Sequence, residues 1–482
     1  MRELCVRTAE DGAILSVPNA INAITTYVLL EQEAWFEKEV AFVRRCIRPG
    51  MTAIDIGANL GVYSIPMARQ AGLTGAVYAY EPTSETRTFL NRSAVLNGCA
   101  NLHIIPAAVS NQEGEAHLVF GTSSELNALG ASGSGERVRL TTLDHEDATR
   151  QWNSPDFIKI DAEGEEQRIL QGGSRFFARY SPLVMFETQA RSTVNQHLRH
   201  DFSTMGYSLY RLLAGEPVLV PDSPDAPNDG FELNLFAAKA DRAAKLAAAG
   251  LLAEKVPTWQ PDAAARREAL QLIGRHPFGA SLMAVHADGA SLGPQFRDGL
   301  AAYNVWRTAE RPLDVRCAAL NFAFSTLQGI CRTHPSLPRL STLARVAREA
   351  GQRLVCVNTL AQLFDRLSKG DVQIQEPFWP ACSRFDAIDP GEDKGAWFVC
   401  SACEGFERAR SFSSIFAVSK LDLKSLCTNP FASAEMERRW ILQLALAGKL
   451  PKVPARLRAP AADHVNADIW STGGVPNTAG NA

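Results

Sequence analysis

Short apolar runs alternate with stretches of helical periodicity between about residues 51 and 240. TAIDIG is followed by VYSIPMARQAG, AVYAYEP by SETRTFLNRSAVLNG, and DFIKIDA by EEQRILQGGSRFFARY. The region closes with the apolar runs PLVMFET, YSLYRLL and FELNLFAAK. Alternation of this kind is typical of a parallel β-sheet covered by helices. The pattern therefore predicts an α/β domain over residues 51–240, with helices on both faces of the sheet.

The flanking segments show helical patterns instead. Residues 20–46 are amphipathic and predict a helix packed on the edge of the sheet. The apolar side of this helix carries Trp35, Phe36, Val40 and Val43. Beyond residue 262, helical periodicity dominates and β-rich runs are few. We predict a helical lead-in (1–50), the α/β domain (51–240), a linker helix (241–262), a helical domain (263–470) and a disordered tail (471–482).

One segment inside the α/β domain has a different composition. Residues 113–144 are rich in Gly and Ser and polar at their centre. Such a composition favours turns over buried strands. We expect a hairpin or loop region here that forms a mobile flap rather than part of the core.

Charge and length exclude several classes of protein. The 482 residues are too many for one ordinary core and suggest two or three domains. With 49 basic and 52 acidic residues, the formal charge of -3 indicates neither a nucleic acid nor an anionic membrane as partner. No apolar run approaches the roughly 18 residues that a membrane helix needs. We expect a soluble, cytoplasmic protein without a membrane span.

The ten cysteines are too sparse for a disulfide scaffold and fit reduced thiols. Cys400 and Cys403 form a C-x-x-C pair, but no second pair at a usual zinc spacing follows. We therefore predict packing rather than metal binding for these two residues.

The turn AIDIGANLGVYS follows the first predicted strand, at the sheet edge where open α/β sheets bind ligands. It carries Asp55, Gly57, Asn59 and Gly61, and Glu81 follows the second strand. A dinucleotide turn reads G-x-G-x-x-G, whereas this one reads D-x-G-x-N-x-G. A carboxylate beside the turn would repel a pyrophosphate and suits a cationic ligand. S-adenosylmethionine fits, with its ammonium near Asp55 and its ribose hydroxyls bridged by Glu81.

Two motifs resemble those of the FkbM-type S-adenosylmethionine-dependent methyltransferases. They are DIGANLGVYS at 55–64 and the more specific IKIDAEGEEQRILQG at 158–172. The resemblance covers roughly residues 20–240. It implies a Rossmann-like class I methyltransferase sheet, S-adenosyl-L-methionine as cofactor, and O-methylation, because known members methylate hydroxyl groups on sugars and natural products.

The carboxylates in and after the second motif are the candidate catalytic residues. Asp161 and Glu163 follow a strand whose carboxyl end faces the predicted cofactor cleft, and Glu187 ends the next strand. We predict that Asp161 contributes to cofactor binding and that Asp161, Glu163 or Glu187 accepts the acceptor's proton. A salt bridge or cap involving Lys159 is the alternative for the first two. These acids could also gather a divalent ion, but their spacing does not require one, so we predict no metal.

Two further acids in this motif, Glu165 and Glu166, stand at the start of the following predicted helix. Carboxylates are favoured there by the exposed amides and the helix dipole. We therefore expect both to be solvated caps.

The sequence as a whole predicts an S-adenosylmethionine-dependent O-methyltransferase acting on a hydroxyl of a sugar, glycan or natural product. One alternative is an inactive methyltransferase fold that serves as a binding or scaffold protein. The other is an NAD(P)-dependent oxidoreductase, against which the missing third turn glycine argues. The helical half could bind the acceptor, hold a carrier protein or form a homodimer, and the sequence does not distinguish these roles.

Overall fold

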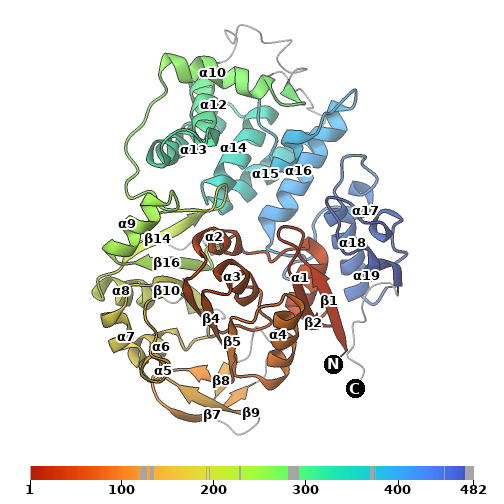
Figure 1. The fold of residues 1–482 in the computed structure, drawn as a ribbon. Coiled ribbons are helices and arrows are strands. Elements are labelled where there is room, and N and C mark those ends of the chain that lie inside the picture. The colour runs from red at the N-terminus through yellow and green to blue at the C-terminus, as the bar shows by residue number, and fades with distance from the viewer. Residues whose placement is uncertain are drawn as a thin grey trace. The chain divides into compact units, whose positions relative to one another are not determined.

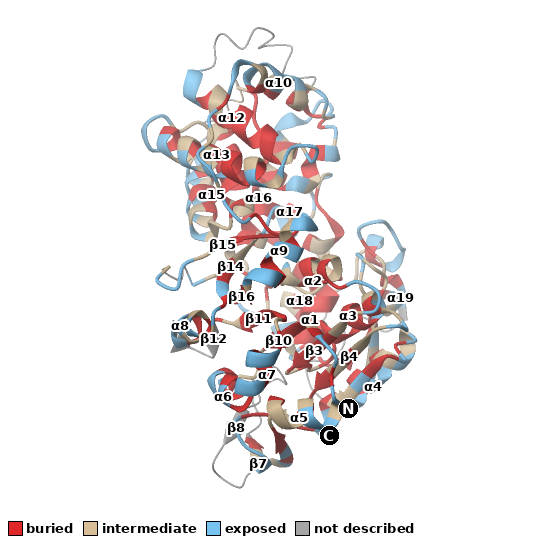
Figure 2. Ribbon diagram, turned by 60° about the vertical axis from the view of Figure 1, so that its left-hand side comes forward, coloured by how far each residue is buried: buried red, intermediate tan, exposed pale blue. Residues whose placement is uncertain are grey.

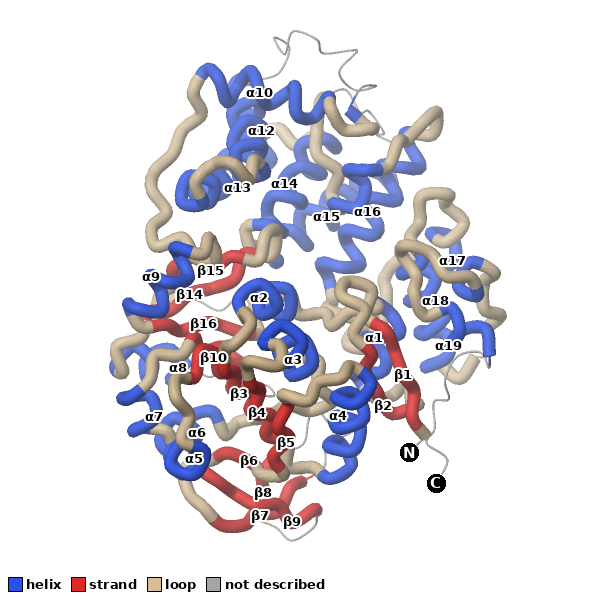
Figure 3. The backbone as a smooth tube through the Cα atoms, viewed as in Figure 1, coloured by secondary structure: helices blue, strands red, loops and turns tan. Residues whose placement is uncertain are grey.

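The computed structural model describes residues 2–119, 128–130, 135–190, 193–194, 196–226, 230–279, 293–369, 374, 376–449 and 451–472 (Figures 1 and 3). The chain divides into two compact units. Unit 1 contains Met1–Leu212, Pro221–Leu251 and Glu437–Ala482, and unit 2 contains Leu213–Val220 and Leu252–Met436. This division differs from the predicted linear one, because the last part of the predicted helical domain groups with unit 1.

The N-terminal part is not the helical lead-in that the sequence pattern suggested. Strands β1 (Glu3–Arg7) and β2 (Ile14–Pro18) form an antiparallel hairpin. The single helix expected over residues 20–46 is two helices, α1 (Ile24–Gln32) and α2 (Glu39–Cys46). The break follows α1 at Glu33, whose φ of 54° lies in the left-handed region and ends a helix.

Seven strands of the large sheet lie almost wholly in unit 1, in the order β14-β16-β11-β10-β3-β4-β5. Strand β16 is antiparallel to both of its neighbours, and the other pairs from β11 to β5 are parallel. The central strands are buried (Figure 2). The strands are β3 (Thr52–Ile56), β4 (Ala76–Tyr80), β5 (Leu102–Ile105), β10 (Pro155–Ile160), β11 (Leu183–Glu187), β14 (Ser208–Leu213) and β16 (Asn234–Ala238).

Helices cover both faces of this sheet. On one face, alternate strand residues such as Ile54, Ile158 and Val184 share a core with side chains of α5 to α8. On the other face, the rings of Phe42 in α2 and Phe236 in β16 lie 5.0 Å apart. The helices are α3 (Ser64–Ala71), α4 (Ser84–Leu96), α5 (Leu143–Arg150), α6 (Glu166–Gly172), α7 (Ser174–Arg179), α8 (Gln196–Thr204) and α9 (Ala240–Ala248). The predicted Rossmann-like sheet with helices on both faces is confirmed.

Most of a second, smaller sheet in the order β6-β9-β7-β8 lies in the predicted flap, and only β6 precedes it. The consecutive antiparallel strands β7 and β8 confirm a hairpin, but Leu118, Val138 and Leu140 are buried, so β7 and β9 belong to the packed structure. Residues 120–127 and 131–134, the rest of the expected flap, lie outside the described residues. The strands are β6 (Ala108–Val109), β7 (Gly114–Val119), β8 (Ala128–Gly130) and β9 (Glu136–Thr141).

Unit 2 is mainly helical, as predicted. Its helices are α10 (Ala263–Gly274), α12 (Pro294–Arg307), α13 (Leu313–Thr333), α14 (Leu337–Glu349), α15 (Arg353–Ser368), η2 (Ser383–Ala387), α16 (Lys394–Arg410) and α17 (Leu423–Leu426), and β15 (Val218–Pro221) is a short strand. Cys400 is buried and Cys403 half-buried in α16. Within the described ranges, neither cysteine belongs to a group of three or more metal-ligating side chains.

None of the helices traced in the described part of the chain is long and apolar enough to cross a membrane. The cytoplasmic location stays a prediction.

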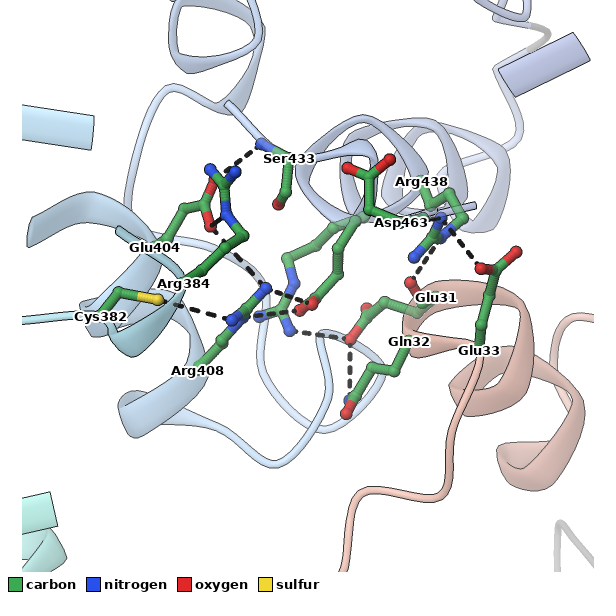
Figure 4. A network of polar contacts seen from close by, with 12 residues as sticks. Glu31, Gln32, Glu33, Cys382, Arg384, Glu404, Arg408, Ser433, Arg438 and Asp463 are labelled. Carbon is green, nitrogen blue, oxygen red and sulfur yellow. Dashed lines mark hydrogen bonds and ion pairs between the residues drawn. The ribbon is translucent and has the colours of Figure 1, made fainter. Parts of the chain in front are cut away.

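Residues after unit 2 return to the N-terminal helix of unit 1. This segment contains most of α18 (Ala434–Leu446), then η3 (Arg456–Arg458) and α19 (Ala467–Thr472). Arg439 forms an ion pair of 3.0 Å with Glu31, and both side chains are almost fully buried. Arg438 Nε donates to the backbone oxygen of Glu31 at 2.8 Å (Figure 4). The C-terminal segment is therefore tied to the end of α1 by buried charges.

Candidate active site

The chain turns sharply as soon as β3 ends. Gly57 and Gly61 have φ values of 79° and 94°, which favour glycine. A Cβ atom on Gly57 would lie 1.8 Å from the carbonyl oxygen of Asp161, and one on Gly61 would lie 2.6 Å from Leu90 Cδ1. The predicted cofactor turn therefore packs directly against the backbone that follows β10, so the two sequence motifs meet at one edge of the sheet.

The Gly57→Ala variant should lower the free energy of unfolding by at least about 2 kcal/mol, because the new methyl group meets backbone atoms as well as an unfavourable φ. Gly72→Ala is a matched control, since Gly72 also has a positive φ of 61° but no atom within 4 Å of its added Cβ. Thermal unfolding of both variants checks the difference. Equal midpoints for the two would contradict the close approach of the turn to Asp161.

Glu81 follows β4 and holds the turn from the neighbouring strand. Its carboxylate accepts hydrogen bonds from the backbone N–H of Asn59 at 3.0 Å and of Thr83 at 2.8 Å. Burial raises the pKa of Glu81, although these N–H groups act in the opposite direction. Each carboxylate oxygen has a second lone pair. Glu81 is thus hydrogen-bonded to Asn59 of the predicted cofactor turn. Its carboxylate oxygens can still accept hydrogen bonds from the hydroxyl groups of a ligand.

Asp55 lies in β3 with its side chain fully buried. Its Oδ2 accepts a hydrogen bond of 2.5 Å from Ser64 Oγ, and its Oδ1 lies 3.9 Å from Lys159 Nζ. No group in the described part of the chain donates a hydrogen bond to Oδ1. Burial raises the pKa of Asp55, opposed by Lys159 and Ser64. A buried acceptor that lacks a donor suits a cationic or donor-bearing ligand.

Lys159 is the cation of the site. Its Nζ lies 2.7 Å from Asp161 Oδ2, and its side chain is 3% exposed, whereas that of Asp161 is 33% exposed. Burial alone would lower the pKa of Lys159, but Asp161 and Asp55 raise it above its usual value. A salt bridge to Lys159 is the alternative that the sequence leaves open to a site role for Asp161. The structure has the salt bridge, and it leaves one third of the Asp161 side chain accessible.

Glu163 and Glu187 complete the acid cluster with Asp161. One carboxylate oxygen from each lies within 4.8 Å of the others. Burial, followed by the charges of Asp161 and Glu163, raises the pKa of Glu187 to about 11. Glu187 therefore carries a proton at neutral pH and can donate a hydrogen bond. Such a cluster also has the ligands that a hard cation prefers, so the absence of a metal stays a prediction.

The expectation of solvated caps is wrong for both Glu165 and Glu166, which are buried. Glu165 accepts hydrogen bonds from Ser110 Oγ at 2.7 Å and from Arg168 Nη1 at 2.6 Å. Glu166 accepts from the backbone N–H of Ala162 at 3.0 Å and of Gly164 at 3.2 Å. Glu166 therefore shapes the loop that carries Asp161 and Glu163 through its backbone amides, whereas Glu165 is held by side chains of other segments.

Comparison with protein families agrees with this arrangement. Residues 55–209 match the model of the methyltransferase FkbM domain. The chain contains an FkbM methyltransferase domain. The match confirms the predicted family for this part of the chain, and with it S-adenosylmethionine as the methyl donor of the domain. A search of curated protein sequences found no match.

The solved structures that resemble the chain are methyltransferases, and each shares little sequence identity with it. The methyltransferase FkbM of Methylobacillus flagellatus is 15% identical with a TM-score of 0.28, over 41% of this chain and 50% of that one. A SAM-dependent methyltransferase of Aquifex aeolicus is 13% identical with a TM-score of 0.27, over 44% and 92%. An rRNA methylase of Streptococcus thermophilus is 9% identical with a TM-score of 0.26, over 42% and 96%. The chain thus spans half the length of the Methylobacillus FkbM protein, and such low scores add nothing to the family match.

Proposed function

We propose that the chain is an S-adenosylmethionine-dependent O-methyltransferase that acts on a hydroxyl group of a sugar, glycan or other natural product. The observation that carries the proposal is the contact between the FkbM turn and Asp161. Because a Cβ on Gly57 would meet the Asp161 carbonyl oxygen, the cofactor turn and the acid cluster share one cleft edge. Ligands of open α/β sheets bind at this edge.

The described residues fit the methyl donor. Glu81 has acceptor capacity for the two ribose hydroxyls, and its hydrogen bond to the Asn59 N–H places this carboxylate beside the turn between Gly57 and Gly61. Asp55 is fully buried, so we assign it an indirect role, through Ser64 and Lys159, in holding the ammonium group. When bound, S-adenosylmethionine supplies an electrophilic methyl group on a sulfonium.

The acid cluster supplies the proton chemistry. Asp161 is accessible enough to accept the proton that the acceptor hydroxyl would lose on receiving the methyl group of bound S-adenosylmethionine. The Lys159 ammonium, 2.7 Å from Asp161 Oδ2, holds one oxygen of this carboxyl group and so fixes its direction at the site. Protonated Glu187 and the neighbouring Glu163 are placed to orient the hydroxyl by hydrogen bonds.

The test is transfer of labelled methyl groups from S-adenosylmethionine to a panel of sugars, hydroxylated natural products and ribosomal RNA, with S-adenosylhomocysteine release as the second readout. We expect a labelled sugar or natural product and no labelled RNA. Binding of the cofactor without turnover on any acceptor would favour the scaffold alternative. Binding of NAD(P) in place of S-adenosylmethionine would favour an oxidoreductase. The three possible roles of unit 2, which are to bind the acceptor, to hold a carrier protein or to form a homodimer, stay predictions.

The Glu81→Ala variant should weaken binding of S-adenosylhomocysteine by about 1.5 to 3 kcal/mol, because a carboxylate contributes hydrogen bonds in this range. This corresponds to roughly 10- to 150-fold in Kd. Titration calorimetry checks the loss, with Glu113→Ala as a control because Glu113 is exposed in the loop before β7. An unchanged Kd in Glu81→Ala would remove this residue from the cofactor site.

A further inference from the structure

The connection between α1 and α2 brings a fourth carboxyl group to the acid cluster. Glu37, in this connection, accepts a hydrogen bond from the hydroxyl of Tyr63. Tyr63 stands two residues after Gly61 of the cofactor turn and directly before α3. The sequence marks neither residue as a site candidate, because no motif contains Glu37 and Tyr63 has no assigned role in the motif DIGANLGVYS.

Tyr63 in turn contacts the cation of the site. The Lys159 ammonium lies 5.1 Å from the centroid of the Tyr63 ring. This distance is within the range of a cation–π interaction, which gains strength when both groups are desolvated. Tyr63 and Lys159 are each 3% exposed. A continuous line of contacts therefore runs from Glu37 through Tyr63 and Lys159 to Asp161.

The charges along this line define the role of each group. Burial, and then the Asp161 carboxylate, raise the pKa of Glu37. Burial and the nearby Glu37 raise the pKa of the Tyr63 hydroxyl well above its usual value. The hydroxyl therefore stays protonated at neutral pH and acts as a hydrogen-bond donor to Glu37. Lys159 remains the cation that Asp161 contacts at hydrogen-bond distance.

The connection that carries Glu37 is firmly held. Glu33 has a left-handed φ of 54°, a conformation that persists only where surrounding contacts impose it. Its buried carboxylate accepts hydrogen bonds from the backbone N–H of Val465 at 2.9 Å and of Asn466 at 3.1 Å. The rings of Trp35 and Phe36 lie 4.5 Å apart. The contacts of Glu33 therefore fix the start of the connection that carries Glu37.

Glu37 also borders a hollow in unit 1. The hollow is small and open to solvent, and Trp35, Glu37 and Val62 are among its lining residues. Val62 and Tyr63 are neighbours in the chain. Glu37 therefore stands where solvent-accessible space approaches the line of contacts to Asp161.

We propose that Glu37 is a positioning residue for methyl transfer, which holds Tyr63 so that the tyrosine ring keeps the Lys159 ammonium between Asp55 and Asp161. The inference rests on the proposed function, in which Asp161 accepts the acceptor's proton. Tyr63→Phe keeps the ring but removes the hydrogen bond to Glu37. Glu37→Ala removes the same bond from the other side, whereas Glu37→Gln keeps an oxygen that accepts it.

The first measurement needs no acceptor. In protein labelled with ¹⁵N at the lysine side chains, the buried Lys159 ammonium should give a slowly exchanging NMR signal, identified by its loss in Lys159→Met. We expect Glu37→Ala and Tyr63→Phe to weaken or shift this signal, and Glu37→Gln to preserve it. Glu113→Gln, at an exposed residue in the loop before β7, should leave it unchanged. A wild-type signal in both Glu37→Ala and Tyr63→Phe, with the fold intact by thermal midpoint, would overturn the proposal.

The second measurement uses the acceptor that the methyl-transfer panel identifies. Turnover should fall at least 10-fold in Glu37→Ala and in Tyr63→Phe, with the Kd of S-adenosylhomocysteine within about threefold of wild type. Because both variants remove one interaction, the double variant should be no slower than the slower single variant. A double variant whose loss of turnover equals the product of the two single losses would overturn the positioning role. A Glu37→Gln variant as slow as Glu37→Ala would overturn it as well. If the wild-type chain methylates no acceptor, the proposed function fails. The NMR measurement still shows whether Glu37 and Tyr63 hold the Lys159 ammonium.

Discussion

The Asp161→Asn variant should transfer methyl groups about 100- to 10,000-fold more slowly than wild type, the usual contribution of a positioned general base. The amide keeps the shape of the side chain but cannot take up the acceptor's proton. One third of the Asp161 side chain is accessible, so an acceptor can contact it directly. Single-turnover transfer from labelled S-adenosylmethionine measures the loss.

Two further measurements separate catalysis from structure in this variant. The Kd of S-adenosylhomocysteine should stay within about threefold of wild type, and a lower thermal midpoint should reflect the Lys159 ammonium that loses its charged partner. Wild-type turnover would transfer the role of base to Glu163 or Glu187. Lost cofactor binding would make Asp161 a residue that holds the ligand instead.

The Arg439→Met variant should lower the free energy of unfolding of unit 1 by about 3 to 5 kcal/mol. The ion pair with Glu31 is almost fully buried, and removal of one partner leaves a carboxylate in a medium that solvates it poorly. Urea unfolding followed by near-ultraviolet circular dichroism measures the loss. If the two units unfold in separate steps, the decrease in the free energy of unfolding should appear in the step in which the α/β sheet unfolds.

A double variant serves as the matched control for this ion pair. Replacing Glu31 and Arg439 together by Leu and Met removes both buried charges and should recover most of the loss, because apolar side chains of similar volume often substitute well for a buried pair. A cost below about 1 kcal/mol in Arg439→Met would show that water reaches Glu31 in solution. It would contradict the buried contact between the C-terminal segment and α1.

The α/β sheet was predictable from the sequence because its signals are local. Each parallel strand is a short apolar run followed by a helical pattern, and the order of the strands confirms the predicted class. The N-terminal region was not predictable in the same way. Residues 20–46 are amphipathic throughout, and nothing in that pattern marks Glu33 as a left-handed residue. Its conformation depends on contacts with Val465 and Asn466, more than 430 residues away.

In the candidate site, too, some residues were predictable from local sequence patterns and others were not. Asp55, Glu81 and Asp161 stand in recognisable motifs and lie at one edge of the sheet. Lys159 could have been placed from strand alternation, since it pairs in register with Asp55 and therefore points to the same face. Glu37 has no such signal, because its approach to Tyr63 depends on the turn between two helices. Glu165 and Glu166 resembled helix caps, whereas Glu165 contacts the distant Ser110 and Glu166 accepts from backbone amides of a loop, neither of which the sequence reveals.

The three-segment composition of unit 1 has a consequence for the order of events during synthesis on a ribosome. Residues of the sheet emerge early, but Val465 and Asn466, which hold Glu33, are translated 432 and 433 residues after it. Until then the connection that carries Glu37 lacks its downstream partners, so a nascent chain can assemble the sheet before it can assemble the complete cleft. Long-range contacts of this kind form slowly and leave apolar surface exposed meanwhile. Ribosome-bound chains stalled before residue 465 should therefore depend on chaperones more than the released protein does.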